Sequence, residues 1–314
     1  MNDLLLSKPD GFSLRAATEF YAGFTPGSGM AAAATDRLTL VFRLDRTFEP
    51  VGVELSEDAR GIVARFAGTK NGHAVERQVG RMLGLTEGGG WLDVGLRDPR
   101  AGALQASFPG FFTAAKASPY DAAAWGVIVP RMNMSVAAKL KIRLAVEHGS
   151  VVHVGGRTHP VFPSPEELLR VQSFAGLSEE KLSRLHGVAR AALEGVLDAD
   201  RLRSRGDAGA IEDLLRLRGV GPWTAAHIYY RGAAPTDGLP LEEPRVLAGF
   251  ADAFGREATP EAFEEAAEAW RPYRMWMCIL LSRHLLRTGG WSRPSFSAHR
   301  GRQKGGATRR AAAQ

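Results

Sequence analysis

The stretch that decides the fold covers residues 214–231 and reads LLRLRGVGPWTAAHIYYR. An amphipathic helix is predicted to end at Leu217, and a second helix begins at Pro222, a residue suited to the first helical position. Gly-Val-Gly at 219–221 predicts a tight turn between them. Such a turn leaves backbone N–H groups free to bind a phosphate. Gly-x-Gly alone also occurs in ordinary helical hairpins, so the longer string carries the functional interpretation.

Two periodicities divide the chain of 314 residues. Alternating or short apolar runs predict strands at 37–48, 51–55, 62–66 and 91–96. After Pro109 the spacing is mainly helical, with a β-hairpin at 151–159 and one long helix over 260–287. We therefore predict an α+β protein in three parts. These are an α+β domain with a small antiparallel sheet at 1–108, a helical domain at 109–294, and a disordered basic tail at 295–314.

The composition limits both chemistry and location. Apolar residues make up 45% and charged residues 24%, which is typical of a globular protein. No apolar run approaches the ~18 residues needed to cross a membrane, and the leucines at 4–6 are too few for a signal peptide, so we expect a cytoplasmic protein. The single cysteine, Cys278, excludes an internal disulfide and a cysteine-ligated zinc or iron–sulfur cluster.

The net charge of +6 is unevenly distributed. The tail holds five basic residues and no acid: Arg300, Arg302, Lys304, Arg309 and Arg310. Without them, the remainder of the chain carries a net charge of only +1. Bulk charge is therefore weak support for a nucleic-acid partner, and the tail is either an unspecific tether or a solvated end.

Three motifs taken together resemble those of one enzyme family. Besides the hairpin, these are Leu-Pro-Leu-Glu-Glu at 239–243 and Trp-Arg-Pro-Tyr-Arg at 270–274. Over roughly residues 10–292 the chain resembles the helix-hairpin-helix DNA glycosylases, and more narrowly bacterial 3-methyladenine DNA glycosylase II. The resemblance implies a monomeric, cofactor-free enzyme of base excision repair. It would bind double-stranded DNA, flip out a damaged nucleotide and hydrolyse the N-glycosidic bond of an alkylated purine such as 3-methyladenine.

The resemblance also implies a catalytic carboxylate at the end of the 239–243 loop. Glu243 is the candidate and Glu242 the alternative. Glu243 precedes Pro244, which is predicted to open a helix whose dipole favours an ionised acid. The family carries aspartate here, and the extra methylene moves the carboxylate by about 1 Å, which can cost about a hundredfold in rate. Two alternatives therefore stay open: a DNA-binding protein of this fold with weakened or lost catalysis, and a glycosylase for oxidised or mispaired bases.

The resemblance further assigns residues to the DNA and to the base. The residues expected at the DNA are Gly219, Val220, Gly221 and Thr224, with Phe108 or Arg131 as the inserted side chain. The residues expected around the base are Trp223, His227, Tyr273 and Ser282. A structural monovalent cation, where the family has one, would bind the carbonyls of Leu217 and Val220. Trp223 stands where strand-cutting glycosylases carry a Schiff-base lysine, so we expect no lyase activity.

Overall fold

The structure is a computed structural model that describes residues 2–290 apart from 24–30, 35, 242 and 258. For residues 31–34 it describes the backbone alone. The predicted tail and the alternative acid Glu242 therefore lie outside the described residues. In the part of the chain that is described, no helix is long and apolar enough to cross a membrane.

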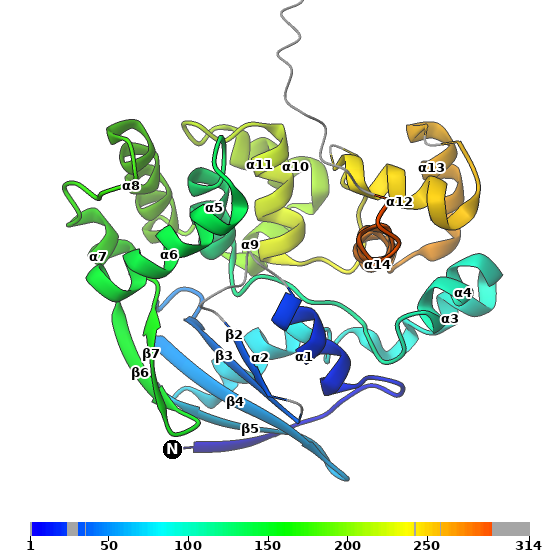
Figure 1. Cartoon of the computed structure of the whole chain (residues 1–314), viewed down its shortest axis with the longest axis horizontal. Coiled ribbons are helices and arrows are strands. Elements are labelled where there is room, and N and C mark those ends of the chain that lie inside the picture. Colours follow the sequence, from blue (N-terminus) through cyan, green and yellow to red (C-terminus); the bar gives the residue numbers. More distant parts are fainter. Residues whose placement is uncertain (1, 24–30, 35, 242, 258, 291–314) are drawn as a thin grey trace, which may run out of the picture.

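The N-terminal part is built on an antiparallel sheet, which confirms the α+β class (Figure 1). The strand order is β1-β5-β4-β3-β2. Its elements are β1 (Asn2–Leu6), α1 (Leu14–Gly23), β2 (Ala31–Ala34), β3 (Arg37–Arg43), β4 (Pro50–Asp58), β5 (Gly61–Ala67), α2 (Gly72–Leu83), a 3-10 helix (Gly88–Gly90), α3 (Asp93–Arg97) and α4 (Pro99–Ala106). In β3 the residues of the predicted alternation, Leu38, Leu40 and Phe42, are buried, but Val41 and Arg43 on the opposite face are buried as well.

Helices dominate the rest of the chain and lie above the sheet in Figure 1. They are α5 (Pro119–Ile128), α6 (Met134–His148), α7 (Pro165–Leu169), α8 (Glu179–Leu193), α9 (Ala199–Ser204), α10 (Gly206–Leu215), α11 (Pro222–His227), α12 (Pro244–Phe254), α13 (Pro260–Ala267) and α14 (Arg274–Arg287). A π-helical segment, Ile228–Ala233, continues α11, and a 3-10 helix, Glu268–Trp270, follows α13. One continuous apolar core joins these helices to the sheet.

The predicted hairpin insert is confirmed as β6 (Ser150–Val154) and β7 (Arg157–Val161). Its turn residues Gly155 and Gly156 have φ of +59° and +71°, as a tight hairpin turn requires. The hairpin lies against the sheet, since a Cβ added to Gly52 of β4 would come within 2.6 Å of the Val154 side chain. An insert in the helical part of the sequence thus packs on the N-terminal sheet.

Two local predictions are wrong. The run at 91–96 is not a strand: Trp91 is buried in an aromatic cluster, and the following residues enter the short helix α3. The segment 260–287 is not one helix either, because the chain breaks at Pro272, between the 3-10 helix and α14. Proline has no N–H to continue a helical hydrogen-bond ladder.

Candidate active site

The turn at 219–221 lies between α10 and α11 (Figure 1). Gly219 has φ +83°, in the left-handed region that favours glycine. Val220 is buried and donates its N–H to the Leu217 carbonyl at 3.0 Å, which closes the turn. Gly219 and Gly221 are exposed, and a Cβ added to Gly221 would meet nothing within 4 Å. A ligand can therefore approach the backbone closely at this turn.

Glu243 is the N-cap residue of α12, as its place before a proline predicts. Its side chain is 21% exposed and faces α11, where Trp223 Nε1 donates to Oε2 at 3.3 Å. Arg245 donates from Nε to Oε1 at 2.8 Å and from Nη2 to Oε2 at 3.1 Å. Burial alone would raise the pKa of Glu243, but the hydrogen bonds and charge of Arg245 outweigh it and lower the pKa. The carboxylate is therefore ionised at neutral pH.

An aromatic pair stands beside this carboxylate. The rings of Trp223 and His227, one helical turn apart on α11, are stacked with centroids 5.1 Å apart and planes at 12°. Burial holds the pKa of His227 well below its usual range, and the charges of Lys116 and Arg231 lower it further. The imidazole is therefore neutral at pH 7. Its Nε2 is a buried atom with no hydrogen-bond partner within the described residues.

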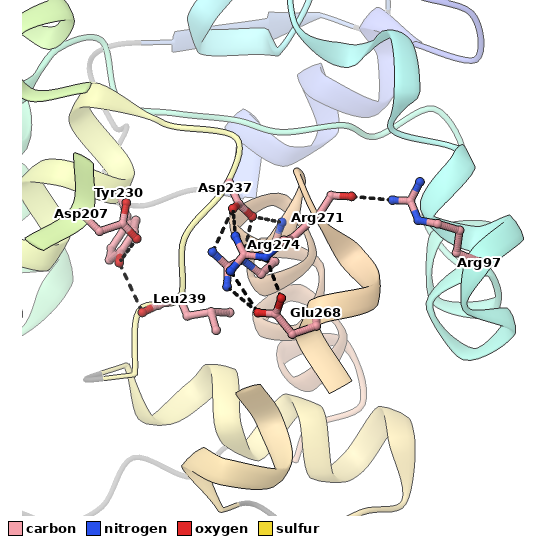
Figure 2. A network of polar contacts seen from close by, with 8 residues as sticks. All are labelled: Arg97, Asp207, Tyr230, Asp237, Leu239, Glu268, Arg271 and Arg274. Atoms are coloured by element: carbon pink, nitrogen blue, oxygen red, sulfur yellow. Dashed lines mark hydrogen bonds and ion pairs between the residues drawn. The ribbon is translucent and has the colours of Figure 1, made fainter. Parts of the chain in front are cut away.

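The loop that leads to Glu243 is held at two points (Figure 2). The Tyr230 hydroxyl donates to the Leu239 carbonyl at 3.3 Å. Asp237 accepts from Arg274 Nε at 2.7 Å and from Nη2 at 2.9 Å. The two anchors tie the loop to the π-helical segment on one side and to α14 on the other. Through Arg274, the motif at 270–274 therefore holds the loop that leads to the candidate acid.

Two residues expected at the DNA are buried. The Thr224 side chain is 8% exposed and lies against Gly126 of α5, so only its backbone could reach a ligand at the turn. Phe108 is also 8% exposed, with the Arg287 guanidinium 4.1 Å from its ring centroid. This corrects the expectation for Phe108, because a side chain covered in this way is not presented to DNA. Arg131 is exposed in the turn between α5 and α6, with φ +60°.

Tyr273 and Ser282 make their polar contacts with residues other than the aromatic pair. Tyr273 is buried, donates its hydroxyl to the Glu87 carbonyl at 2.7 Å and packs edge-on against Trp91. The Ser282 hydroxyl donates to the Cys278 carbonyl of its own helix at 3.0 Å. Within the described residues, no hydrogen bond or ring contact links either one to Trp223, His227 or Glu243. Tyr273 is therefore a core residue, which corrects its expected place around the base, whereas the place of Ser282 there stays a prediction.

Metal ligands are not gathered at this site. Among residues 2–290, outside the gaps named above, no group of three or more His, Cys, Asp or Glu side chains could hold a metal ion. The Leu217 carbonyl accepts one hydrogen bond, from Val220, and a carbonyl has a second lone pair. The expected monovalent cation at the Leu217 and Val220 carbonyls stays a prediction.

Sequence reasoning missed Arg245 and Asp237. Arg245 lies two residues after the candidate acid, and an arginine in the first turn of a helix capped by a carboxylate was an available signal. Asp237 had no local signal, because its partner Arg274 is 37 residues away.

Comparisons with known proteins support the superfamily. No protein-family model matches the chain. The chain is 23% identical over 172 residues to a DNA-3-methyladenine glycosylase of Bacillus subtilis, and the aligned region covers 53% of this chain and 57% of that protein. It is 30% identical over 184 residues to a probable bifunctional transcriptional activator/DNA repair enzyme AlkA of Mycobacterium tuberculosis, over 56% of this chain and 36% of that protein. The match thus spans less than two thirds of either relative.

A solved structure covers more of the fold. The 3-methyladenine DNA-glycosylase from Archaeoglobus fulgidus aligns with a TM-score of 0.72 and 20% identity, over 92% of this chain and 99% of that one. At this identity the likeness concerns the fold. It includes both the N-terminal sheet and the helical part that carries the turn and Glu243. The chain thus has the fold of the helix-hairpin-helix DNA glycosylases and resembles the 3-methyladenine DNA glycosylases among them.

Proposed function

We propose that the protein is a monofunctional DNA glycosylase that hydrolyses the N-glycosidic bond of alkylated purines. The observation that carries the proposal is the place of Glu243. Its carboxylate is ionised and largely buried, and Oε2 lies 3.3 Å from Nε1 of Trp223. Trp223 follows the exposed glycine turn by two residues. A turn that can bind a DNA phosphate, with an acid close to it, suits an enzyme that binds a phosphate and acts on the adjoining sugar.

The chemistry asks for negative charge beside the sugar. Alkylation at a ring nitrogen already makes the base a good leaving group, so positive charge develops on the deoxyribose as the bond breaks. Glu243 would stabilise that charge and orient the attacking water. The Trp223–His227 stack offers an aromatic face to a cationic base. The neutral imidazole of His227 does not repel that base, since burial lowers its pKa.

The remaining parts bind and hold the DNA. The amides of the 219–221 turn would contact a phosphate, and a monovalent cation at the Leu217 and Val220 carbonyls would stiffen the turn. Arg131, which is exposed in the turn after α5, would reach the DNA beside the flipped nucleotide. We propose a monomer, because one protein encloses one extruded nucleotide. Trp223 occupies the position of the lyase lysine, so we expect no strand cleavage by a Schiff base.

A second candidate is a DNA-binding protein of this fold that has lost catalysis. It is favoured by the ion pair of Glu243 with Arg245, which offsets the negative charge that the reaction needs. One assay separates the two. Duplex DNA carrying a methylated purine is incubated with the protein and then treated with alkali, which breaks the strand at abasic sites. Alkali-dependent breaks support the enzyme, and binding without breaks supports the second candidate.

Variants identify the acid. Glu243→Gln keeps the shape of the side chain and removes its charge, so we expect base release to fall by at least a hundredfold. Glu242→Gln is the matched control at the neighbouring acid and should retain activity. Full activity in Glu243→Gln would remove this residue from the mechanism, and loss only in Glu242→Gln would assign the reaction to the other acid.

A further inference from the structure

Helix α8 connects the Arg131 turn to the glycine turn. The Lys181 ammonium donates to the carbonyls of Ile128 at 2.6 Å and of Pro130 at 2.8 Å, at the end of α5. These bonds tether the residues immediately before Arg131. Arg131 itself has φ +60° and an exposed side chain. Lys181 thus holds in place a turn that projects an arginine to solvent.

One helical turn further along α8, Arg184 lies over the glycine turn. A Cβ added to Gly219 would come within 2.7 Å of both Cδ and Nε of Arg184. Arg184 Nη2 also donates to Glu180 at 2.5 Å, but the two side chains are 36% and 68% exposed. An exposed pair of this kind contributes at most about 1 kcal/mol, and the guanidinium has five N–H donors. Arg184 can therefore still donate to an anion beside Gly219.

Lys181 lies close enough to both Arg131 and Arg184 for their charges to repel its own. Burial lowers the pKa of Lys181, and the charges of Arg184 and Arg131 lower it further. Like charges gathered at a surface are unfavourable in the free protein and favourable against a polyanion, which releases counterions when it binds.

We propose that Arg131, Lys181 and Arg184 form a phosphate-binding surface that continues from the glycine turn to the Arg131 turn. We call it the α8 cation surface. Its ligand is the sugar–phosphate backbone of duplex DNA, bound without regard to sequence or damage. The DNA identity of this ligand rests on the proposed function. The surface itself does not depend on base release.

The test is the salt dependence of binding to undamaged duplex DNA. Fluorescence anisotropy of a labelled 20-base-pair duplex is measured between about 50 and 300 mM KCl, and log Kobs is plotted against log [KCl]. Loss of one phosphate contact should reduce the slope by about 0.9. We expect this reduction for Arg184→Gln and for Arg131→Gln. Arg184→Lys keeps the charge and should keep the slope, which separates charge from packing against Gly219.

Arg190→Gln is the matched control. It removes an exposed arginine of the same helix, six residues further along and on a different side. Unchanged slopes in both Arg184→Gln and Arg131→Gln would overturn the inference, as would an equal reduction in Arg190→Gln. If those slopes stay unchanged while the wild type still releases methylated bases, only this surface is refuted. If the wild type binds no duplex DNA at all, both proposals fail.

Discussion

Arg271 and Arg274 are two arginines that bind the same two carboxylates, those of Asp237 and Glu268 (Figure 2). The Arg274 side chain makes two hydrogen bonds to Asp237, at 2.7 and 2.9 Å, and one to Glu268 at 3.1 Å. Arg271 makes one to Asp237 at 2.7 Å and two to Glu268, at 2.7 and 3.0 Å. If each hydrogen bond counted equally, the two arginines would contribute equally to the free energy of unfolding. The side chains differ in exposure, which is 13% for Arg274 and 49% for Arg271.

Burial predicts unequal effects when each arginine is replaced by methionine, which keeps the length and removes the charge. Breaking a buried ion pair costs about 3–5 kcal/mol, because a charge is left unpaired. Asp237 keeps one arginine, so we expect Arg274→Met to lower the free energy of unfolding by about 2–3 kcal/mol. Arg271→Met should lower it far less, since water screens an exposed pair.

The assay is urea unfolding at pH 7, in low salt and in 1 M NaCl. The effect of Arg271→Met should nearly vanish in 1 M NaCl, where charges are screened beyond about 3 Å, while that of Arg274→Met should persist. Arg274→Met should also slow base release by about a hundredfold, because the loop before Glu243 would lose an anchor. Equal losses of stability in the two variants would refute the argument from burial.

Four further predictions concern the turn, a buried acid and the candidate catalytic pair. Gly219→Ala should destabilise the protein by about 1–2 kcal/mol, since its φ is +83° and a neighbouring arginine fills the space. Gly221→Ala should leave the melting temperature unchanged, because its φ is −96°, yet weaken DNA binding at the exposed backbone; intact binding would contradict this. Asp121 is buried between two lysines, and although burial alone would raise its pKa, their charges and hydrogen bonds lower it to about 2. Its stabilisation is therefore complete above about pH 4 and is lost as the pH falls towards 2, and Asp121→Asn should remove this acid dependence from urea titrations. Arg245→Gln should raise the pKa of Glu243 and shift the acidic limb of the pH–rate profile to higher pH, and an unmoved limb would exclude that coupling.

Local patterns in the sequence were sufficient for much of the architecture. The glycine turn at 219–221 and the hairpin at 151–159 depend on residues that are neighbours in the chain, and both occur where expected. The place of Glu243 at the start of α12 follows from the proline after it. In each case the backbone conformation is decided within a few residues, by glycine at positive φ or by proline at the first helical position.

Side-chain surroundings could not be predicted in this way. Tyr273 and Trp223 are both aromatic residues in helical surroundings, yet one is buried against Trp91 and the other lies beside the candidate acid. Phe108 stood in a plausible loop, but Arg287, 179 residues later, covers its ring.

By itself, the sequence determined the α+β class, the turn between two helices and the acid at a helix start, because these follow from short-range backbone preferences. Only the tertiary structure decided that Arg245 and Trp223 hold Glu243, that Tyr273 belongs to the core, and that α8 joins the two turns. The physical reason is that burial and pairing depend on residues brought together from distant parts of the chain. The spacing of apolar residues along the sequence does not predict which of these residues come into contact.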